Sequence, residues 1–292
     1  MTQPEIYTRG LGKRAMSESN DEQIKYWNGS AGNTWTQSQE RMDLMLQPLT
    51  QVALEAAQAG SDDYIIDIGC GCGDTSLQLA EVAAQVRGID ISEPMLQRAR
   101  ERATALGLSN ISFETADAAI TPLTAEHQLL FSRFGIMFFA DPTAAFKNLR
   151  GGLTLGGRLC FICWRPPRQN PWMSVGGAAI APFLPEPETP LDPRAPGPFA
   201  FADKDYLAGV LTAAGFKAID IAPVDRTLKL ADTLDDAMRF QGEIGPVARA
   251  LSELEGTQKE RALAAARTAL AEHLTTDGIN LGAAIWLVTA RV

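Results

Sequence analysis

The sequence predicts a doubly wound α/β fold, and two observations lead to this prediction. Short apolar stretches with the length of strands, the first at residues 64–68, alternate with helical stretches of about ten residues. Strands separated by helices form parallel sheets, because a parallel pair needs a crossover connection. A glycine-rich segment at residues 69–73 directly follows the first strand, as in nucleotide-binding folds of this class.

The elements of the first half are predicted from their apolar pattern and from their end signals. Strands are expected at residues 64–68, 86–89, 111–113, 128–131 and 158–164. Helices are expected at residues 33–59, 75–84, 93–106 and 142–149. Ser92 is the expected N-cap of the third helix and Gly107 its end, while Asp141 and the following proline begin the fourth.

The pattern changes after residue 164. Residues 165–198 are rich in proline and glycine, which predicts a long loop that is either a functional cover or disordered. Regular structure is then expected as a helix at 205–214, a strand at 217–221, helices at 234–254 and 258–274, and a last strand at 283–292. Two helices before a last strand indicate an insertion between neighbouring strands.

The composition indicates which kinds of binding partner and which cellular compartment to expect. The chain of 292 residues has 35 acidic and 26 basic residues and a net charge of −9, which disfavours a nucleic-acid partner. Four cysteines do not make a disulfide framework, so we expect a reduced, cytoplasmic protein. The first residues are polar, and no apolar stretch reaches the roughly 18 residues that membrane insertion requires.

The glycine-rich segment carries the most information about the ligand. Its pattern is D-x-G-x-G-x-G, beginning at Asp67. A dinucleotide fingerprint requires G-x-G-x-x-G, but its third glycine falls on Asp74 or on Ser76 in the two available registers. An acid two residues before Gly69 suits the ammonium group of an amino acid and does not suit a pyrophosphate. The spacing therefore argues against a nicotinamide-dependent oxidoreductase.

Two further acids follow predicted strands. Asp90 ends the second strand, where a carboxylate accepts hydrogen bonds from ribose hydroxyls. Asp117 follows the third strand, where a carboxylate can accept from an adenine amino group. Together they indicate a nucleoside.

These segments together resemble a known family. The matching pieces, in chain order, are residues 67–73, Asp90, residues 116–118, residues 132–135 and residues 153–157. They resemble the class I S-adenosylmethionine-dependent methyltransferases, in particular the small-molecule group similar to ubiquinone and menaquinone methyltransferases. The resemblance implies a Rossmann-like, mostly parallel sheet of seven strands with an antiparallel last strand and helical lid insertions.

The resemblance also implies a domain organisation and a set of cofactor-binding residues. Residues 1–60 would begin as a mobile arm and cover the cofactor, and residues 61–165 would form the binding core. Residues 166–200 and 230–280 would form the substrate cover, and residues 201–229 and 281–292 would complete the sheet. The implied cofactor contacts are Asp67, Gly69, Gly71, Asp74 and Thr75 at the methionine end, Asp90 and Ile91 at the ribose and adenine, Ala116, Asp117 and Ala118 at the adenine edge, and Ser132, Arg133 and Phe134 beside the sulfonium. The aromatic residues Tyr26, Trp27 and Trp35 are expected to fold over the cofactor.

The implied reaction is direct displacement of a methyl group from S-adenosylmethionine, leaving S-adenosylhomocysteine. Because the leaving group is already activated, alignment and exclusion of water supply much of the catalysis. His273 and Arg133 are the candidate catalytic residues. The alternative for His273 is a solvated position at a helix end, and the alternative for Arg133 is an ion pair with a structural carboxylate. His127 is expected at the surface. Cys70 and Cys72 are expected to pack, and no metal site is predicted.

The apolar and aromatic content of the cover predicts a small, partly apolar or aromatic substrate and offers a contact for a homodimer. The sequence leaves open which atom accepts the methyl group. It also leaves open a non-catalytic scaffold or sensor that binds the same cofactor. A protein or RNA methyltransferase is disfavoured by the acidic charge.

Overall fold

A computed structural model of the chain describes residues 21–185 and 192–292. The expected start of the N-terminal arm, residues 1–20, lies outside these ranges. Residues 21–28 are helical and lead into α2 (Ser30–Gln37) and α3 (Gln39–Ala57). The single helix predicted at 33–59 is therefore two helices that meet at Ser38.

The sheet has the predicted doubly wound topology. Its order is β3 (Ile111–Thr115), β2 (Gln85–Asp90), β1 (Tyr64–Ile68), β4 (His127–Arg133), β5 (Leu153–Trp164), β8 (Gly278–Arg291) and β6 (Lys217–Ala231). The first five strands are parallel, and β8 runs antiparallel to both β5 and β6. A two-residue strand, β7 (Leu274–Thr275), pairs with β8 outside this path. The predicted seven-stranded sheet with an antiparallel last strand is confirmed.

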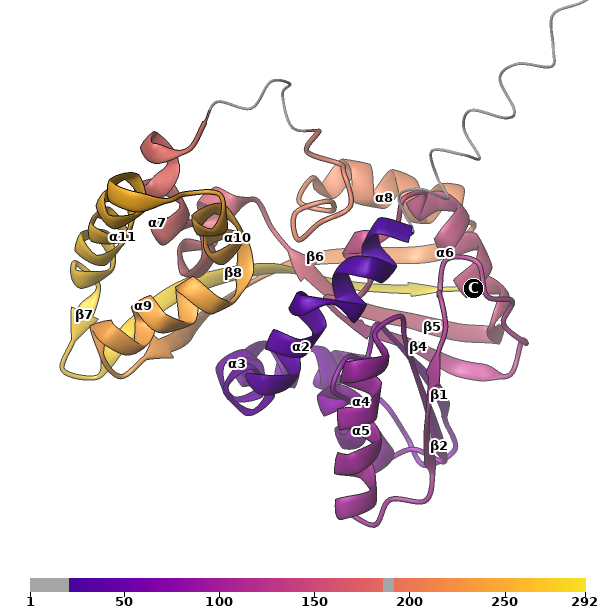
Figure 1. The fold of residues 1–292 in the computed structure, drawn as a ribbon. Coiled ribbons are helices and arrows are strands. Elements are labelled where there is room, and N and C mark those ends of the chain that lie inside the picture. Colours follow the sequence, from indigo (N-terminus) through magenta and orange to yellow (C-terminus); the bar gives the residue numbers. More distant parts are fainter. Residues whose placement is uncertain (1–20, 186–191) are drawn as a thin grey trace, which may run out of the picture.

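Helices cover both faces of the sheet. They are α4 (Asp74–Ala80), α5 (Glu93–Ala105), α6 (Pro142–Gly151) and α8 (Lys204–Ala213), together with α3. Figure 1 shows α6 and α8 on one side of the sheet and α3, α4 and α5 on the other. The predicted N-cap of α6 is present, because the carboxylate of Asp141 accepts a hydrogen bond from Ala144 N.

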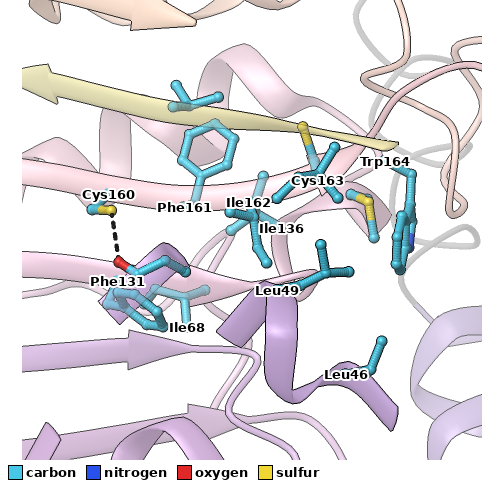
Figure 2. Packing of buried hydrophobic residues seen from close by; sticks show 14 of the residues in the cluster. Leu46, Leu49, Ile68, Phe131, Ile136, Cys160, Phe161, Ile162, Cys163 and Trp164 are labelled. Atoms are coloured by element: carbon cyan, nitrogen blue, oxygen red, sulfur yellow. Dashed lines mark hydrogen bonds between the residues drawn. The ribbon is translucent and has the colours of Figure 1, made fainter. Parts of the chain in front are cut away.

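The core lies between α3 and the central strands. Residues 65–68 of β1 are all buried, as expected for a strand covered on both faces. Figure 2 shows Leu46 and Leu49 of α3 next to Ile68 and the side chains of β4 and β5. The thiol of Cys160 donates to the carbonyl of Ala53 at 3.6 Å, which ties β5 to α3. This packing holds the carboxyl ends of β1, β4 and β5 in fixed positions.

The prediction of a loop at residues 165–198 is wrong for much of this range. It contains α7 (Pro171–Ile180) between the short 3₁₀ helices η2 (Pro167–Gln169) and η3 (Ala181–Phe183). The prolines are compatible with helix because Pro171 occupies the first turn. Gly176 leaves room for the side-chain amide of Gln241, which would have to move if a Cβ were present.

The helical cover consists of α7, α9 (Leu234–Glu243), α10 (Gly245–Ser252) and α11 (Gly256–Ala271), at the left of Figure 1. It has a small hydrophobic core of its own, the cover cluster, made of Ile180, Val247, Leu251, Leu254, Ala262 and Ala266. The predicted helices at 234–254 and 258–274 are therefore present, the first as two separate helices.

The strands that carry the helical cover are longer than predicted. β6 extends from Lys217 to Ala231 and pairs with β8 over most of this length. Pro223 does not end it, because β6 is an edge strand with a neighbour on one side only. Residues 153–157, which precede the strand predicted at 158–164, form the start of β5, and the pairing of β5 with β4 shifts register there. No helix in the described ranges combines the length and apolarity needed to cross a membrane.

Candidate functional site

A cavity of about 740 Å³ opens at the carboxyl ends of the parallel strands. Its lining comes from the N-terminal segment, α3, the ends of β1, β2 and β4, and the helical cover. In open α/β sheets ligands bind at this edge, where the chain connections leave in opposite directions from neighbouring strands. Here those neighbours are β1 and β4.

The glycine-rich segment forms the floor of the cavity. Gly69, Gly71 and Gly73 all have positive φ, at 64°, 54° and 83°, which residues with a Cβ rarely adopt. A Cβ on Gly69 would lie 2.5 Å from the Cα of Gly135, at the end of β4. The segment is held by its own amides, with Gly69 N donating to Ile89 O at 2.8 Å. The floor is therefore a preformed backbone surface that small residues alone permit.

Asp67 does not reach the cavity, which corrects its expected contact with the methionine end. Its side chain is fully buried beneath the floor, where Oδ2 accepts from Thr75 Oγ1 at 2.7 Å and from Ser76 Oγ at 2.6 Å. Its Oδ1 has no hydrogen-bond partner among the described residues. Burial raises the pKa of this carboxyl to about 6, although both hydroxyl donors lower it. Asp67 supports the floor from below.

Asp90 lies where the sequence predicted, at the end of β2 on the cavity wall. Its Oδ2 accepts from Gly71 N and its Oδ1 from Ser92 N, both at 2.8 Å. Burial raises the pKa of Asp90, although these amide donors lower it. A carboxylate has about four acceptor sites, so these amide bonds leave capacity for a ligand hydroxyl. Ser92 occupies the N-cap position of α5, but its hydroxyl oxygen accepts from no amide of the helix, so the expected side-chain cap is absent; the hydroxyl donates to Trp27 O.

The residues expected around an adenine line the same wall. Ile91 follows Asp90, and Ala116, Asp117 and Ala118 follow β3. One oxygen of Asp117 accepts from Ala119 N at 2.9 Å, which orients the carboxylate. The wall thus presents aliphatic side chains together with two carboxylates.

Arg133 belongs to a charge network and does not stand alone. Its Nη1 lies 2.7 Å from Asp74 Oδ2 and its Nη2 3.6 Å from Asp43 Oδ1. Arg102 completes the network at 3.0 Å from Asp43 and 3.7 Å from Asp74. Burial and the neighbouring Asp74 raise the pKa of Asp43, which the two arginines lower. This charge network of two acids and two bases joins α3, α4, α5 and β4, so the ion-paired alternative for Arg133 is the one observed.

Ser132 and Phe134 have separate roles on either side of Arg133. Ser132 is fully buried, and its hydroxyl donates to Ile68 O at 2.7 Å, so the expected position beside the ligand is wrong. Phe134 has a φ of 64° and lines the cavity, with its ring stacked on Trp164 at 4.0 Å and 6°. The positive φ turns this ring away from the strand and towards the cavity wall.

The N-terminal aromatic residues close one side of the cavity. Tyr26, Trp27 and Trp35 all line it, as the sequence predicted. The Trp27 ring makes edge contacts with Trp35 at 6.2 Å and with Phe138 at 5.4 Å. Asn28 Nδ2 donates to Ile91 O at 2.8 Å, which fastens this segment to the end of β2.

The cavity thus has two sides. The glycine-loop side is formed by the N-terminal segment, α3 and the ends of β1 to β4, and it contains the charged groups described above. The aromatic side is formed by β5 and the helical cover, with Trp164, Trp172, Met173, Phe240, Gln241, Ile244 and Val247. Trp164 and Trp172 have ring centroids 5.0 Å apart.

Comparisons with known proteins agree with this geometry. Residues 65–157 match the family model of a methyltransferase domain. The demethylmenaquinone methyltransferase of Deinococcus radiodurans is 30% identical over 187 residues, which cover 57% of this chain and 73% of that protein. The chain belongs to the class I S-adenosylmethionine-dependent methyltransferases.

Other relatives show how far the likeness extends. The aklanonic acid methyltransferase of a Streptomyces species is 32% identical over 152 residues, and the match spans 51% of this chain but 64% of that relative's length. The crystal structure of the YcgJ protein of Bacillus subtilis has a TM-score of 0.57 at 16% identity, covering 84% of this chain and 98% of that one. A [4+2]-cyclase, SpnF, has a TM-score of 0.50 at 18% identity, covering 84% of this chain and 79% of that one, so the fold also serves another reaction.

The cavity fits the cofactor of this methyltransferase, S-adenosylmethionine. The glycine floor leaves space that a Cβ would fill, and the wall beside it carries carboxylates and aliphatic groups suited to ribose and adenine. Its volume is within the range of about 300–1,000 Å³ that is common for small-molecule sites.

The two histidines do not reach the site of the methyltransferase. His273 follows the end of α11 and is not part of the cavity lining, so the helix-end alternative is the one observed. His127 is buried at the start of β4, with Nδ1 3.0 Å from Gly152 O, and is not a surface residue. Burial lowers the pKa of this imidazole. Neither side chain is placed to act as a general base.

The cysteines behave as packing residues. Cys70 and Cys72 are buried free thiols in the floor, and burial raises the pKa of Cys72 to about 11. Among the described residues, no group of three or more His, Cys, Asp or Glu could hold a metal ion.

Some cavity residues were missed in the sequence. Asp43, Met42 and Leu46 of α3 line the cavity, although their helical spacing indicated only a buried helix face. Gln241 also lines it, and its position depends on a contact with Trp172 across 69 residues of chain. No local signal marks such a residue, because its role comes from a tertiary contact.

Proposed function

We propose that this methyltransferase transfers the methyl group of S-adenosylmethionine to a small, largely apolar or aromatic acceptor by direct displacement. The observation that carries the proposal is that one cavity joins the glycine-loop side to the aromatic side. A cofactor on the first side and an acceptor on the second would lie in the same cavity. Two relatives are named for methylation of aklanonic acid and of demethylmenaquinone, which supports a small-molecule acceptor.

The geometry of the cavity supports a set of proposed cofactor contacts. The backbone of Gly69 and Gly71 lies along the methionine part, and Asp90 accepts hydrogen bonds from the ribose hydroxyls. Asp117 accepts from the adenine amino group, between the aliphatic side chains of Ile91 and Ala118. Phe134 and the charge network border the sulfonium end.

The chain contributes alignment and exclusion of water. S-adenosylmethionine supplies a methyl group on a sulfonium, which is already activated for transfer. Trp27 and Trp35 line the cavity from the N-terminal segment, and residues of the helical cover line its other side. Holding the acceptor in line with the methyl group in such a space supplies much of the rate enhancement.

A nucleic-acid acceptor is less compatible with this site. The net charge is −9, and the charged residues on the cavity wall are acidic apart from Arg133, which is paired. Nucleic-acid binding normally requires clustered lysine and arginine side chains that contact phosphates.

Calorimetric titration with S-adenosylmethionine, S-adenosylhomocysteine and NAD tests the cofactor. We expect micromolar binding of the first two and no response to NAD. Screening phenols, amines and quinones with radiolabelled S-adenosylmethionine then tests the acceptor class. Cofactor binding without turnover of any acceptor would favour a non-catalytic scaffold or sensor and contradict the proposed function.

A further inference from the structure

The amino-acid end of S-adenosylmethionine carries two charged groups that need partners. Its ammonium group donates hydrogen bonds, and its carboxylate group accepts them. Asp67, the acid expected to suit the ammonium group, lies beneath the floor and is bonded to Thr75 and Ser76. Because charges removed from water are normally paired in proteins, other charged side chains are expected at this end of the cofactor.

The charge network supplies side chains of both signs next to the glycine floor. Asp43, Asp74 and Arg133 line the cavity, and their side chains are 13–17% exposed. Arg102, the fourth member, is not a lining residue, and it donates to Cys72 O of the floor at 2.8 Å. The network is therefore fixed to the floor and partly open to the cavity.

The two oxygens of Asp43 are engaged to different degrees. Oδ2 accepts from Gln39 Nε2 at 2.5 Å and lies 3.0 Å from Arg102 Nη2. Oδ1 accepts no hydrogen bond from the described residues, and it lies 3.6 Å from Arg133 Nη2, which is longer than a hydrogen bond. Oδ1 is therefore the oxygen of Asp43 that keeps acceptor capacity for a ligand.

The two terminal nitrogens of Arg133 differ in the same way. Nη1 donates to Thr50 Oγ1 at 2.6 Å and to Asp74 Oδ2 at 2.7 Å. Nη2 makes no hydrogen bond within the described ranges, and its acidic neighbour is Asp43 Oδ1 at 3.6 Å. Nη2 is therefore the nitrogen of Arg133 that keeps donor capacity for a ligand.

The open oxygen of Asp43 and the open nitrogen of Arg133 match the amino-acid end as a pair. Their separation of 3.6 Å is close to that between the ammonium nitrogen and the carboxylate oxygens of an α-amino acid. A zwitterion lying against them in the opposite sense places each of its charges beside an opposite charge. The network of two acids and two arginines has no net charge, so it repels neither group.

We infer that the charge network receives the amino-acid end of the cofactor, with Asp43 Oδ1 accepting from the ammonium group and Arg133 Nη2 donating to the carboxylate group. The inference rests on the proposed function, which places the cofactor on the glycine-loop side. Asp74 and Arg102 are positioning residues, because they hold Arg133 Nη1 and Asp43 Oδ2. Asp43 thus takes the role that the sequence suggested for Asp67.

This arrangement selects a nucleoside that carries a whole amino acid. 5′-Deoxy-5′-methylthioadenosine has the adenine, ribose and thioether of S-adenosylhomocysteine but neither charged group. It leaves the open atoms of Asp43 and Arg133 without a partner, so we expect it to bind at least about 50-fold more weakly than S-adenosylhomocysteine. The 3-aminopropylthio analogue lacks only the carboxylate group, and the 3-carboxypropylthio analogue lacks only the ammonium group.

Calorimetric titration of the full chain with S-adenosylhomocysteine and these three analogues tests each contact separately. Asp43→Asn removes the charge and keeps the size of the side chain. We expect it to weaken the binding of the two ligands that have an ammonium group about tenfold, because a hydrogen bond between charged groups is lost. The Kd of 5′-deoxy-5′-methylthioadenosine should stay within about twofold, which shows that the variant is folded and that its nucleoside site is intact.

Arg133→Lys tests the other contact. Lysine can still pair with Asp74, but it lacks the second terminal nitrogen that arginine offers to a carboxylate. We expect the two ligands that have a carboxylate group to bind about fivefold to tenfold more weakly. The 3-aminopropylthio analogue and 5′-deoxy-5′-methylthioadenosine should keep their affinities.

Asp63→Asn is the matched control. Asp63 pairs with Arg158 at 2.6 Å, its side chain is buried to the same degree as those of the network, and it is not a cavity-lining residue. This variant also loses one charge of an ion pair, so it measures the general effect of such a loss. We expect all four affinities to stay within about twofold of the unchanged protein.

The outcomes separate this inference from the proposed function. An equal loss of affinity for all four ligands in Asp43→Asn, or no loss for any of them, would show that the network only supports the fold, and the inference would be wrong. Equal affinity of the unchanged protein for S-adenosylhomocysteine and 5′-deoxy-5′-methylthioadenosine would also overturn it, while the cofactor assignment stands. Failure of the unchanged protein to bind any of the four ligands would overturn the proposed function itself.

Discussion

The two sides of the cavity are built from different kinds of interaction. The glycine-loop side depends on backbone geometry, because Gly69, Gly71 and Gly73 all have positive φ. Its carboxylates are held by amides and hydroxyls. The aromatic side depends on apolar side chains of β5 and of the helical cover, most of which pack in the main core, while Val247 belongs to the separate cover cluster. Changes in the first side should therefore alter cofactor binding, whereas changes in the second should alter the acceptor pocket.

The difference shows which parts of the site tolerate change. A backbone floor at close approach accepts few substitutions, because even one Cβ requires the strands to move. A wall of apolar side chains can be repacked at modest cost while volume and apolarity are kept. We expect the glycine-loop side to set the cofactor and the aromatic side to set the acceptor.

The largest effect is expected when a Cβ is added to the floor. Gly69→Ala combines a positive φ with a contact of 2.5 Å to Gly135, so we expect at least 50-fold weaker S-adenosylmethionine binding and a loss of about 3 kcal/mol in unfolding free energy. Calorimetry and urea unfolding measure the two effects. Gly177→Ala in α7 is the matched control, since its Cβ would meet no atom within 4 Å. Equal behaviour of the two variants would contradict the difference between the two sides.

The next effect separates the stability of the cover from cofactor binding. Ile180 is fully buried in the cover cluster, and Ile180→Ala should lower the unfolding free energy by about 3–4 kcal/mol. The S-adenosylmethionine Kd should stay within threefold, while limited proteolysis of the helical cover becomes faster. Leu155→Ala, at a side chain that is 99% exposed, serves as the control. A large loss of cofactor affinity in Ile180→Ala would mean that the two sides are coupled.

The third prediction concerns pH and the buried acid beneath the floor. Burial raises the pKa of Asp67 from 3.8 to about 6, so in this window the native protein keeps a proton that the unfolded chain releases. Stability should therefore fall as pH rises from 4 to 6 and then level off. The shift of about two pH units corresponds to about 3 kcal/mol.

Asp67→Asn should lack this contribution. Urea unfolding of both proteins at pH 4.5, 5.5, 6.5 and 7.5 measures it, because Asp43 and Asp90, whose pKa values are also raised, are present in both proteins. The variant should gain stability relative to the parent as pH rises. A difference between the proteins that does not change with pH would show that Asp67 does not titrate in this window.

The smallest effect is expected at the proposed ribose contact. Asp90→Ala should weaken S-adenosylmethionine binding at least tenfold while the protein remains folded, because a charge-assisted hydrogen bond contributes about 1.5–3 kcal/mol. Circular dichroism and calorimetry measure the fold and the affinity. Glu126→Ala, an exposed acid before β4, should change neither. An unchanged affinity in Asp90→Ala would remove the ribose assignment.

The elements that sequence predicted well are those with local causes. Residues 64–68 form β1 with the predicted bounds, since a short apolar run before glycines has few alternatives. Asp141 caps α6 because its carboxylate bonds an amide three residues later. The predictions of a short strand at 217–221 and of a loop in place of α7 were wrong. Proline is permitted in β6 because β6 is an edge strand, and glycine is accommodated in α7 because it packs against Gln241.

The sequence by itself determined the order of strands and helices, the glycine floor and the acids at the strand ends. These features depend on neighbouring residues and on periodicity, which are present in one stretch of chain. Tertiary structure alone decided that Asp67 lies beneath the floor, that Arg133 is paired with Asp74, and that Gln241 holds Trp172 at the cavity wall. Each depends on burial or on a partner distant in sequence, and the free energy of a buried polar group is set by those surroundings.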